Sequence, residues 1–291
     1  MTDFALLLMV TGLVSGAAYA LIAMGFALIY KATGVVNFAQ GELVMLTAYI
    51  AYSLSTAFEL SFLPLMALTV PLAMALGLFL ERVFIRPMLG EPVFSIVMVT
   101  IGLAVILRGL TIMIWGPNPF QFRAGFSNDV IHIGPVPFYE AHLWTLGTLA
   151  VLSAATWAFF RFTRIGIAMR AAASDERAAL LMGISVPRIH ATAWALSAAL
   201  AAVAGVLFSA IFTLGPDLWF QGMRAFPAVI LGGLDSPLGA ALGGLVIGVV
   251  ENMAQGYLGQ GLREIAGFLI IVIVLMVRPY GLFGERDIER V

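Results

Sequence analysis

Three polar side chains, Asn37, Gln40 and Glu42, lie within six residues between two apolar stretches of the chain. An asparagine can cap a helix, and a glutamine three residues later can close a capping box. Glu42 then falls in the first helical turn, where the positive end of the helix dipole favours a carboxylate. Two roles stay open for this polar start. It is either a helix cap at a membrane interface or the lining of a substrate path, because carboxylates inside a membrane usually face a cavity or a partner.

Arg108 is a charge in the middle of the apolar run 93–115. An arginine deep in a bilayer costs at least ~2.5 kcal/mol, so it needs a carboxylate partner or a water-filled cavity. Glu42 and Glu251 are the candidate partners, and the sequence does not choose between them. The alternative is that the long side chain reaches the nearby interface.

A third polar interruption combines Gly232, Gly233, Asp235 and Pro237 between two apolar segments, 225–234 and 238–250. The pattern predicts a broken or re-entrant pair of helices with its turn on the cytosolic side, and such backbone must be buried in protein or line water. One long tilted helix over 225–250 is the alternative. The spacing of Gly239 with Gly243, of Gly244 with Gly248 and of Gly12 with Gly16 favours close helix packing.

The segment 161–190 is the longest candidate cytosolic loop and contains a short predicted helix. Ser174 is the expected N-cap, Asp175 and Glu176 occupy the first turn, and Gly183 ends the helix. Arg177, Ala178 and Ala179 lie between these signals. The helix either docks in a groove of a soluble partner or rests on the bilayer surface.

Composition excludes a soluble domain, because 62% of the residues are hydrophobic, only 11% are charged and the mean hydropathy is +1.03. Intrinsic disorder is excluded with it. The net charge of −1 gives no reason to expect a nucleic-acid partner. There is no cysteine, and His132, His142 and His190 are too scattered for a metal site, so we expect no bound metal or cofactor.

The apolar pattern predicts an all-α polytopic membrane protein with about eight membrane segments, the broken pair counting as one, in a single domain over residues 1–291. The expected segments are 4–30, 37–58, 62–80, 93–115, 143–160, 191–214, the pair 225–234 and 238–250, and 264–277. With the N-terminus outside and the C-terminus cytosolic, eleven of the fifteen basic residues fall inside. These eleven are Lys31, Arg82, Arg86, Arg161, Arg164, Arg170, Arg177, Arg188, Arg278, Arg286 and Arg290.

The external loop 116–142 contains an alternating run, Val130 to Gly134, that predicts one strand of a small hairpin. The loop is either a docking surface for an extracytoplasmic protein or a simple connector. No Walker A motif, zinc-protease motif or nucleophile elbow is present, so an enzyme is not expected. Two classes remain: a permease energised by a separate ATPase, and an ion-driven carrier or channel.

Four blocks resemble LivH-type permeases of branched-chain amino-acid ABC importers. They are Gly34-Val-Val-Asn-Phe-Ala-Gln-Gly-Glu-Leu, Gly166-Ile-Ala-Met-Arg-Ala through Met182-Gly-Ile, Leu231-Gly-Gly-Leu-Asp-Ser-Pro-Leu-Gly, and Arg278-Pro-Tyr-Gly-Leu-Phe-Gly. Two positions depart from the pattern. Arg177 stands where the loop motif of the wider importer class has Glu, and Asp235 stands where a Gly often occurs.

The resemblance implies an inner-membrane permease for leucine, isoleucine and valine, or for other small neutral amino acids, that works by alternating access. Its partners would be a LivM-like permease, two cytosolic ATPase subunits carrying ATP and Mg²⁺, and a periplasmic binding protein. Ser174–Gly183 would be the coupling helix that contacts the ATPase. Asn37, Gln40, Glu42 and Arg108 would lie near the substrate path. A secondary amino-acid carrier is the alternative function.

Overall fold

The computed structural model describes residues 2–126, 130–133, 136–259 and 261–284, and this part of the chain is mostly helical. Six helical stretches are long and apolar enough to cross a membrane. They lie in α1 (Thr2–Thr33), α3 (Phe62–Leu80) with its extension to Met88, α4 (Val93–Trp115), α5 (Glu140–Phe162), α8 (Val186–Ile211) and α11 (Pro237–Leu258). The long apolar runs of the sequence therefore became helices, as expected.

Shorter helices and one hairpin complete the fold. The helices are α2 (Gln40–Phe58), α6 (Arg164–Ser174), α7 (Glu176–Leu181), α9 (Leu218–Arg224), α10 (Phe226–Gly232) and α12 (Leu262–Val277). A π-helical turn, Glu81–Ile85, and a 3₁₀ turn, Arg86–Met88, extend α3. The expected hairpin is present: β1 (Val130–Ile133) pairs antiparallel with β2 (Val136–Tyr139), so that Val130 lies opposite Tyr139.

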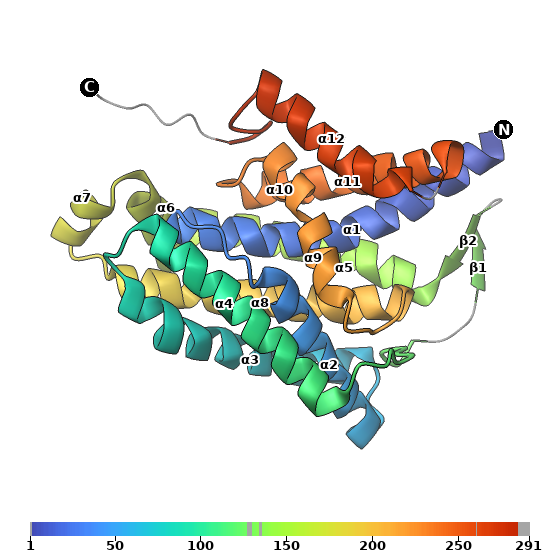
Figure 1. Ribbon diagram of the computed structural model, residues 1–291, viewed down its shortest axis with the longest axis horizontal. Helices are drawn as coiled ribbons and strands as arrows, with labels where there is room; N and C mark the ends of the chain where they lie inside the picture. Colours follow the sequence, from blue (N-terminus) through green and yellow to red (C-terminus); the bar gives the residue numbers. More distant parts are fainter. Residues whose placement is uncertain (1, 127–129, 134–135, 260, 285–291) are drawn as a thin grey trace.

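The helices form an elongated bundle around α1 (Figure 1). The hairpin and the N-terminal end of α1 lie at one end of the long axis, and α6 and α7 lie at the other. α8 and α11 pack on α1, and the buried centre includes Tyr19, Tyr49 and Trp194. The core is rich in alanine, which lets the helix backbones approach closely.

Glycines bring α1 and α11 into backbone contact. A Cβ added at Gly248 would lie 2.2 Å from the Cα of Gly16, and one added at Gly244 would lie 2.5 Å from the Cα of Ala20. No side chain fits such gaps. The small-residue pairs seen in the sequence thus hold this helix pair together.

Two chain breaks lie inside the bundle rather than at its ends. After α1, residues 34–39 run back toward the middle without forming a helix, and α2 starts there (Figure 1). The expected start of this helix at residue 37 was therefore wrong by three residues. The second break separates α9 from α10 at Ala225.

The sequence predicted a pair of short helices over 225–234 and 238–250, and the second of these helices is longer than predicted. α10 ends at Gly232 and a turn follows, but α11 continues for 22 residues to Leu258. α11 is therefore long enough to cross a membrane by itself. A single long helix over 225–250 is excluded, because the turn at 233–236 interrupts it.

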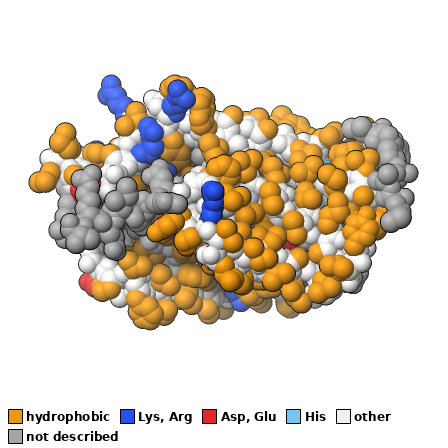
Figure 2. All heavy atoms as spheres, turned by 90° about the horizontal axis from the view of Figure 1, so that it is seen from above, with side chains coloured by type: hydrophobic (Ala, Val, Ile, Leu, Met, Phe, Trp, Pro, Cys, Tyr) orange, Lys and Arg blue, Asp and Glu red, His pale blue; other side chains and the backbone are white. Residues whose placement is uncertain are grey.

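The outer surface is apolar over most of the bundle. Only 22% of the most apolar stretch of α4 and 11% of that of α5 are buried, whereas the figure for α8 is 78%. On the face that shows α11 and α12, hydrophobic side chains predominate and the basic side chains gather toward the end with α6 and α7 (Figure 2). Such a surface needs lipid or another apolar chain around it.

Candidate functional site

The start of α2 is buried in the middle of the bundle. Asn37 is 1% exposed, Gln40 0% and Glu42 2%. The expected capping box is not formed. Helix α2 follows Ala39, which makes no side-chain cap. The side chain of Asn37 instead accepts a hydrogen bond from the amide of Ala39 at 3.0 Å and donates one to Gln40 Oε1 at 3.4 Å.

Gln40 connects this break to two other helices. Ser197 on α8 donates a hydrogen bond to Gln40 Oε1, and its hydroxyl is also 2.9 Å from the carbonyl oxygen of Gly25 on α1. The amide nitrogen Nε2 of Gln40 is buried and has no hydrogen-bond partner in the described part of the chain. A buried amide without a partner is costly, which marks this position as more than a packing residue.

Of the two carboxylates that the sequence offered as partners of Arg108, Glu42 is the one that forms the ion pair, and Glu251 is not. Its Nη2 contacts Glu42 Oε1, and its guanidinium lies 3.5 Å from the ring centre of Trp219 on α9. The Glu42 side chain is 3% exposed, but that of Arg108 is 33% exposed. The arginine therefore does not simply extend to an interface. It holds a buried carboxylate on one side and keeps part of its charge accessible on another.

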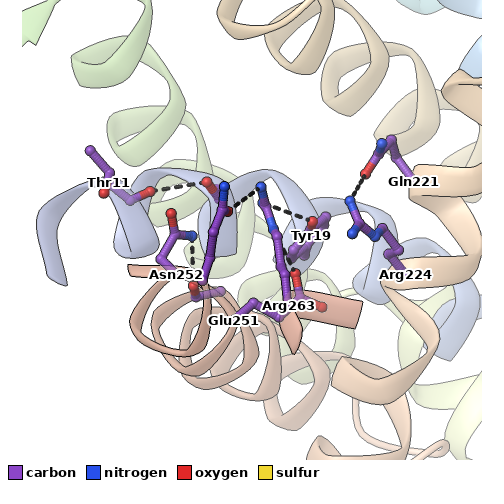
Figure 3. A network of polar contacts seen from close by, with 10 residues as sticks. Thr11, Tyr19, Gln221, Arg224, Glu251, Asn252 and Arg263 are labelled. Carbon is purple, nitrogen blue, oxygen red and sulfur yellow. Dashed lines mark hydrogen bonds and ion pairs between the residues drawn. The ribbon is translucent and has the colours of Figure 1, made fainter. Parts of the chain in front are cut away.

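A second charged network lies where α1, α11 and α12 meet (Figure 3). Arg263 Nε is 3.4 Å from Glu251 Oε2, and its Nη atoms donate to Gln255 at 3.1 Å and to the Tyr19 hydroxyl at 3.4 Å. Glu251 is only 2% exposed. From the sequence, Glu251 was a candidate partner only for Arg108, and Arg263 was not singled out. The signal that could have identified this pair is a carboxylate twelve residues before an arginine, with both near the ends of consecutive apolar segments.

Helix α9 lies between these two charged groups. Trp219 stacks on Arg108, and Arg224, at the other end of α9, donates to Gln221 at 3.5 Å beside the second network (Figure 3). Helix α9 packs tightly against α2, because a Cβ added at Gly41 would lie 2.3 Å from the carbonyl oxygen of Trp219. α9 thus contacts the Glu42–Arg108 pair through Trp219 and brings Arg224 close to the second network (Figure 3).

The short helix predicted within the 161–190 loop is present but is shorter than expected. α7 covers Glu176–Leu181, and its N-cap is Asp175, whose Oδ1 accepts from the amide of Ala178 at 2.9 Å. Ser174 is the last residue of α6, so its expected cap was wrong. Gly183 ends the helix as expected, with a φ of +81°. Ala178 is exposed and Ala179 is buried, while the side chains of Glu176 and Arg177 lie outside the described residues.

The turn between α10 and α11 lies at the same end of the bundle (Figure 1). Gly233 has a φ of +107°, and Ser236 caps α11 by accepting from the amide of Gly239 at 3.1 Å, with Pro237 in the first turn. Lys31 donates to the carbonyl oxygen of Asp235 at 2.9 Å. The amide of Phe283 donates to Gly232, so the chain after α12 folds onto this turn.

A groove opens beside this turn, lined among others by Lys31, Arg170, Ser174, Asp235 and Tyr280. It joins the end of α1 to α6 and to the α10–α11 turn. No group of three or more metal-binding side chains occurs among the residues described.

A bundle of apolar helices with charged, broken-helix elements buried at its centre defines a membrane transport protein. Residues 8–277 match the model of the family described as "Branched-chain amino acid transport system / permease component". The chain belongs to this family. It is a permease component of a transport system, not an enzyme by family, and a multi-pass protein of the inner (plasma) membrane.

Individual relatives agree with this assignment. The chain is 33% identical over 225 residues to the high-affinity branched-chain amino acid transport system permease protein LivH of Escherichia coli K12, covering 74% of this chain and 72% of that protein. LivH of Salmonella typhimurium is 32% identical and BraD of Pseudomonas aeruginosa is also 32% identical, with the same coverage. A solved structure, PsaBC from Streptococcus pneumoniae in complex with Fab, has a TM-score of 0.48 and 13% identity over 93% of this chain and 91% of that one, too low to compare folds.

Proposed function

We propose that this chain is the permease subunit of an ATP-binding-cassette importer for branched-chain, or other small neutral or hydrophobic, amino acids. It works by alternating access with a homologous LivM-like permease, two cytosolic ATPase subunits and a periplasmic binding protein. ATP and Mg²⁺ bind to the ATPase subunits and no cofactor binds to this chain. The chain has about eight membrane segments, counting the broken or re-entrant pair around the α10–α11 turn as one, with its N-terminus outside and its C-terminus cytosolic.

The observation that carries this proposal is the helix α7 at one end of the bundle (Figure 1). Leu180, Leu181 and Met182 at its C-terminal end are 51%, 89% and 83% exposed. Three neighbouring apolar side chains on a short helix outside the candidate spans favour insertion into a groove of another protein. We assign Ser174, Asp175, Glu176, Arg177, Ala178, Ala179 and Gly183 to this coupling element.

The substrate path is the second part of the proposal. Asn37, Gln40, Glu42 and Arg108 lie beside it, and Trp219 joins them. The partly exposed guanidinium of Arg108, held in place by the buried Glu42, suits the carboxylate group of an amino acid in passage. The α10–α11 turn with Gly232, Gly233, Asp235 and Pro237 lies toward the same end of the bundle as α6 and α7, and this end faces the ATPase subunits (Figure 1).

The test is co-purification of the tagged chain from its native membrane. Leu181→Asp, which leaves the Asp175 cap intact, is expected to abolish recovery of the ATPase subunits while the partner permease is still recovered. Arg123→Glu, an exposed change near the opposite end, is the matched control and should keep both.

An ion-driven carrier was the other function left open by the sequence, and the family match favours the importer over it. Purification of the chain without any ATPase, together with uptake that resists ATP depletion and follows an ion gradient, would replace the importer by the carrier. Full ATPase recovery in Leu181→Asp would instead keep the importer and move the coupling contact away from α7.

A further inference from the structure

The bend between α5 and α6 carries exposed aromatic, aliphatic and basic side chains together. Trp157 is 45% exposed, Phe162 67% and Ile165 49%, and Arg161 and Arg164 are exposed beside them. We call these five residues the bend surface. α5 is the least buried of the six candidate spans, so the bend surface continues an apolar face and begins where a membrane-crossing helix ends.

The geometry of the bend is fixed by local contacts. Thr163 caps α6 by accepting from the amide of Gly166 at 3.0 Å, and its hydroxyl donates to the carbonyl oxygen of Phe159 at 2.7 Å. A Cβ added at Gly166 would lie 2.2 Å from that same carbonyl oxygen. Met169 on the other side of α6 is fully buried. The bend surface therefore points away from the bundle on a rigid support.

Neither arginine of the bend surface is neutralised by a described residue, and Arg161 is also oriented by two aromatic rings. The guanidinium carbon of Arg161 lies 5.2 Å from the ring centre of Trp157 and 5.7 Å from that of Phe162. Neither Arg161 nor Arg164 has an ion-pair partner among the described residues. No Asp or Glu occurs in the sequence between Glu140 and Asp175. This leaves two cationic groups held next to an apolar, membrane-facing surface.

We propose that the bend surface binds the headgroup of an anionic phospholipid. Arg161 and Arg164 contact the phosphate, since guanidinium groups match phosphate oxygens in two-point hydrogen bonding. Trp157, Phe162 and Ile165 contact the upper acyl chain, as aromatic side chains do at membrane interfaces. A lipid fits better than a soluble acidic protein because the exposed apolar side chains continue directly into the face of α5.

The test uses the purified protein in nanodiscs of phosphatidylcholine alone or with 30 mol% phosphatidylglycerol. The anionic lipid is expected to raise the melting temperature of the wild type by at least about 3 °C. Arg161→Gln/Arg164→Gln should lose at least half of this rise, and Arg161→Lys/Arg164→Lys should keep part of it. Arg82→Gln, an exposed arginine at the end of another span, is the matched control and should keep the full rise.

An equal rise in the double Gln variant and the wild type would overturn the proposal. Equal losses in the double Gln variant and in Arg82→Gln would also overturn it, because the effect would then be a general charge effect. If the double Gln variant keeps the lipid effect but loses co-purifying ATPase, the bend surface is a protein contact instead.

Discussion

At the scale of single residues, the central feature is that the charges buried in this membrane protein occur in pairs. Glu42 meets Arg108 and Glu251 meets Arg263, and both carboxylates are about 2% exposed. A lone carboxylate at such depth would be very costly, whereas a partner offsets part of that cost. The partner of Glu42 is itself one-third exposed, so the two members of the pair are not equivalent.

This asymmetry leads to a prediction for the Glu42–Arg108 pair. Arg108→Gln should lower stability more than Glu42→Gln, because it leaves the buried carboxylate alone, whereas the exposed guanidinium can use water. The double variant should be more stable than the sum of the single changes predicts, with a coupling free energy of about 1–3 kcal/mol. Thermal unfolding of the four proteins in detergent measures this cycle. Strictly additive losses would mean that the contact contributes nothing.

At the scale of elements, helix packing depends on where a Cβ can be placed. A Cβ added at Gly248 would lie 2.2 Å from the Cα of Gly16, whereas one added at Gly102 on α4 would have nothing within 4 Å. Both lie inside helices, so their intrinsic helix propensities are the same. Only the neighbouring helix distinguishes them.

We therefore expect opposite results from one substitution at these two glycines. Gly248→Ala should destabilise the protein by about 1–3 kcal/mol or more through overpacking of α1 against α11. Gly102→Ala should be neutral or stabilising by up to about 1 kcal/mol, since alanine is the better helix former. The melting temperatures of the two purified variants, each compared with that of the wild type, test this expectation. Equal shifts in the two variants would contradict the observed α1–α11 packing.

The coupling element permits a second prediction at this scale. Asp175→Ala should remove the cap of α7, at a local cost of about 1 kcal/mol, and lower ATP-driven transport without preventing insertion. Asp175→Asn retains the acceptor and should preserve transport. Ser174→Ala, one residue earlier, should have no effect because Ser174 is the end of α6 and not a cap. Amino-acid uptake into proteoliposomes that contain the partner subunits measures the effect. A loss of uptake in Ser174→Ala would indicate that Ser174 caps the helix, as the sequence predicted.

At the scale of the whole molecule, the two ends of the bundle differ. The hairpin and the N-terminal end of α1 lie opposite α6, α7 and the α10–α11 turn (Figure 1). The bias of basic residues predicts that the second end is cytosolic. Arg286 and Arg290, which contributed to that bias, lie outside the described residues.

The absence of cysteine makes this orientation easy to measure. Single replacements Ser174→Cys and Arg123→Cys are both at exposed positions, and the cysteine-free parent is the control. A membrane-impermeant maleimide is expected to label Arg123→Cys in whole spheroplasts and Ser174→Cys only in inverted vesicles. Labelling of both from the same side would require a different number of crossings.

The sequence alone determined the class of protein and most of its helices. Apolar runs of about twenty residues with few charges have no other stable form in a bilayer, because every backbone polar group must be bonded internally. Local residue types also predicted the hairpin, the end of helix α7 at Gly183 and the close helix packing at Gly248. These features depend on neighbours within a few positions, or on the size of one side chain.

Only the tertiary structure decided which charges meet and where the helices break inside the bundle. Glu42 and Glu251 were equal candidates for Arg108, and the choice came from the placement of α2 beside α4. The backbone from 34 to 39 stays non-helical, although local signals favoured an earlier start at Asn37. In this conformation the Asn37 side chain forms hydrogen bonds with Ala39 and Gln40. Gln40 in turn accepts a hydrogen bond from Ser197, which is 157 residues away in the sequence. Such contacts between distant segments carry no periodic signal, so they exist only once the bundle has formed.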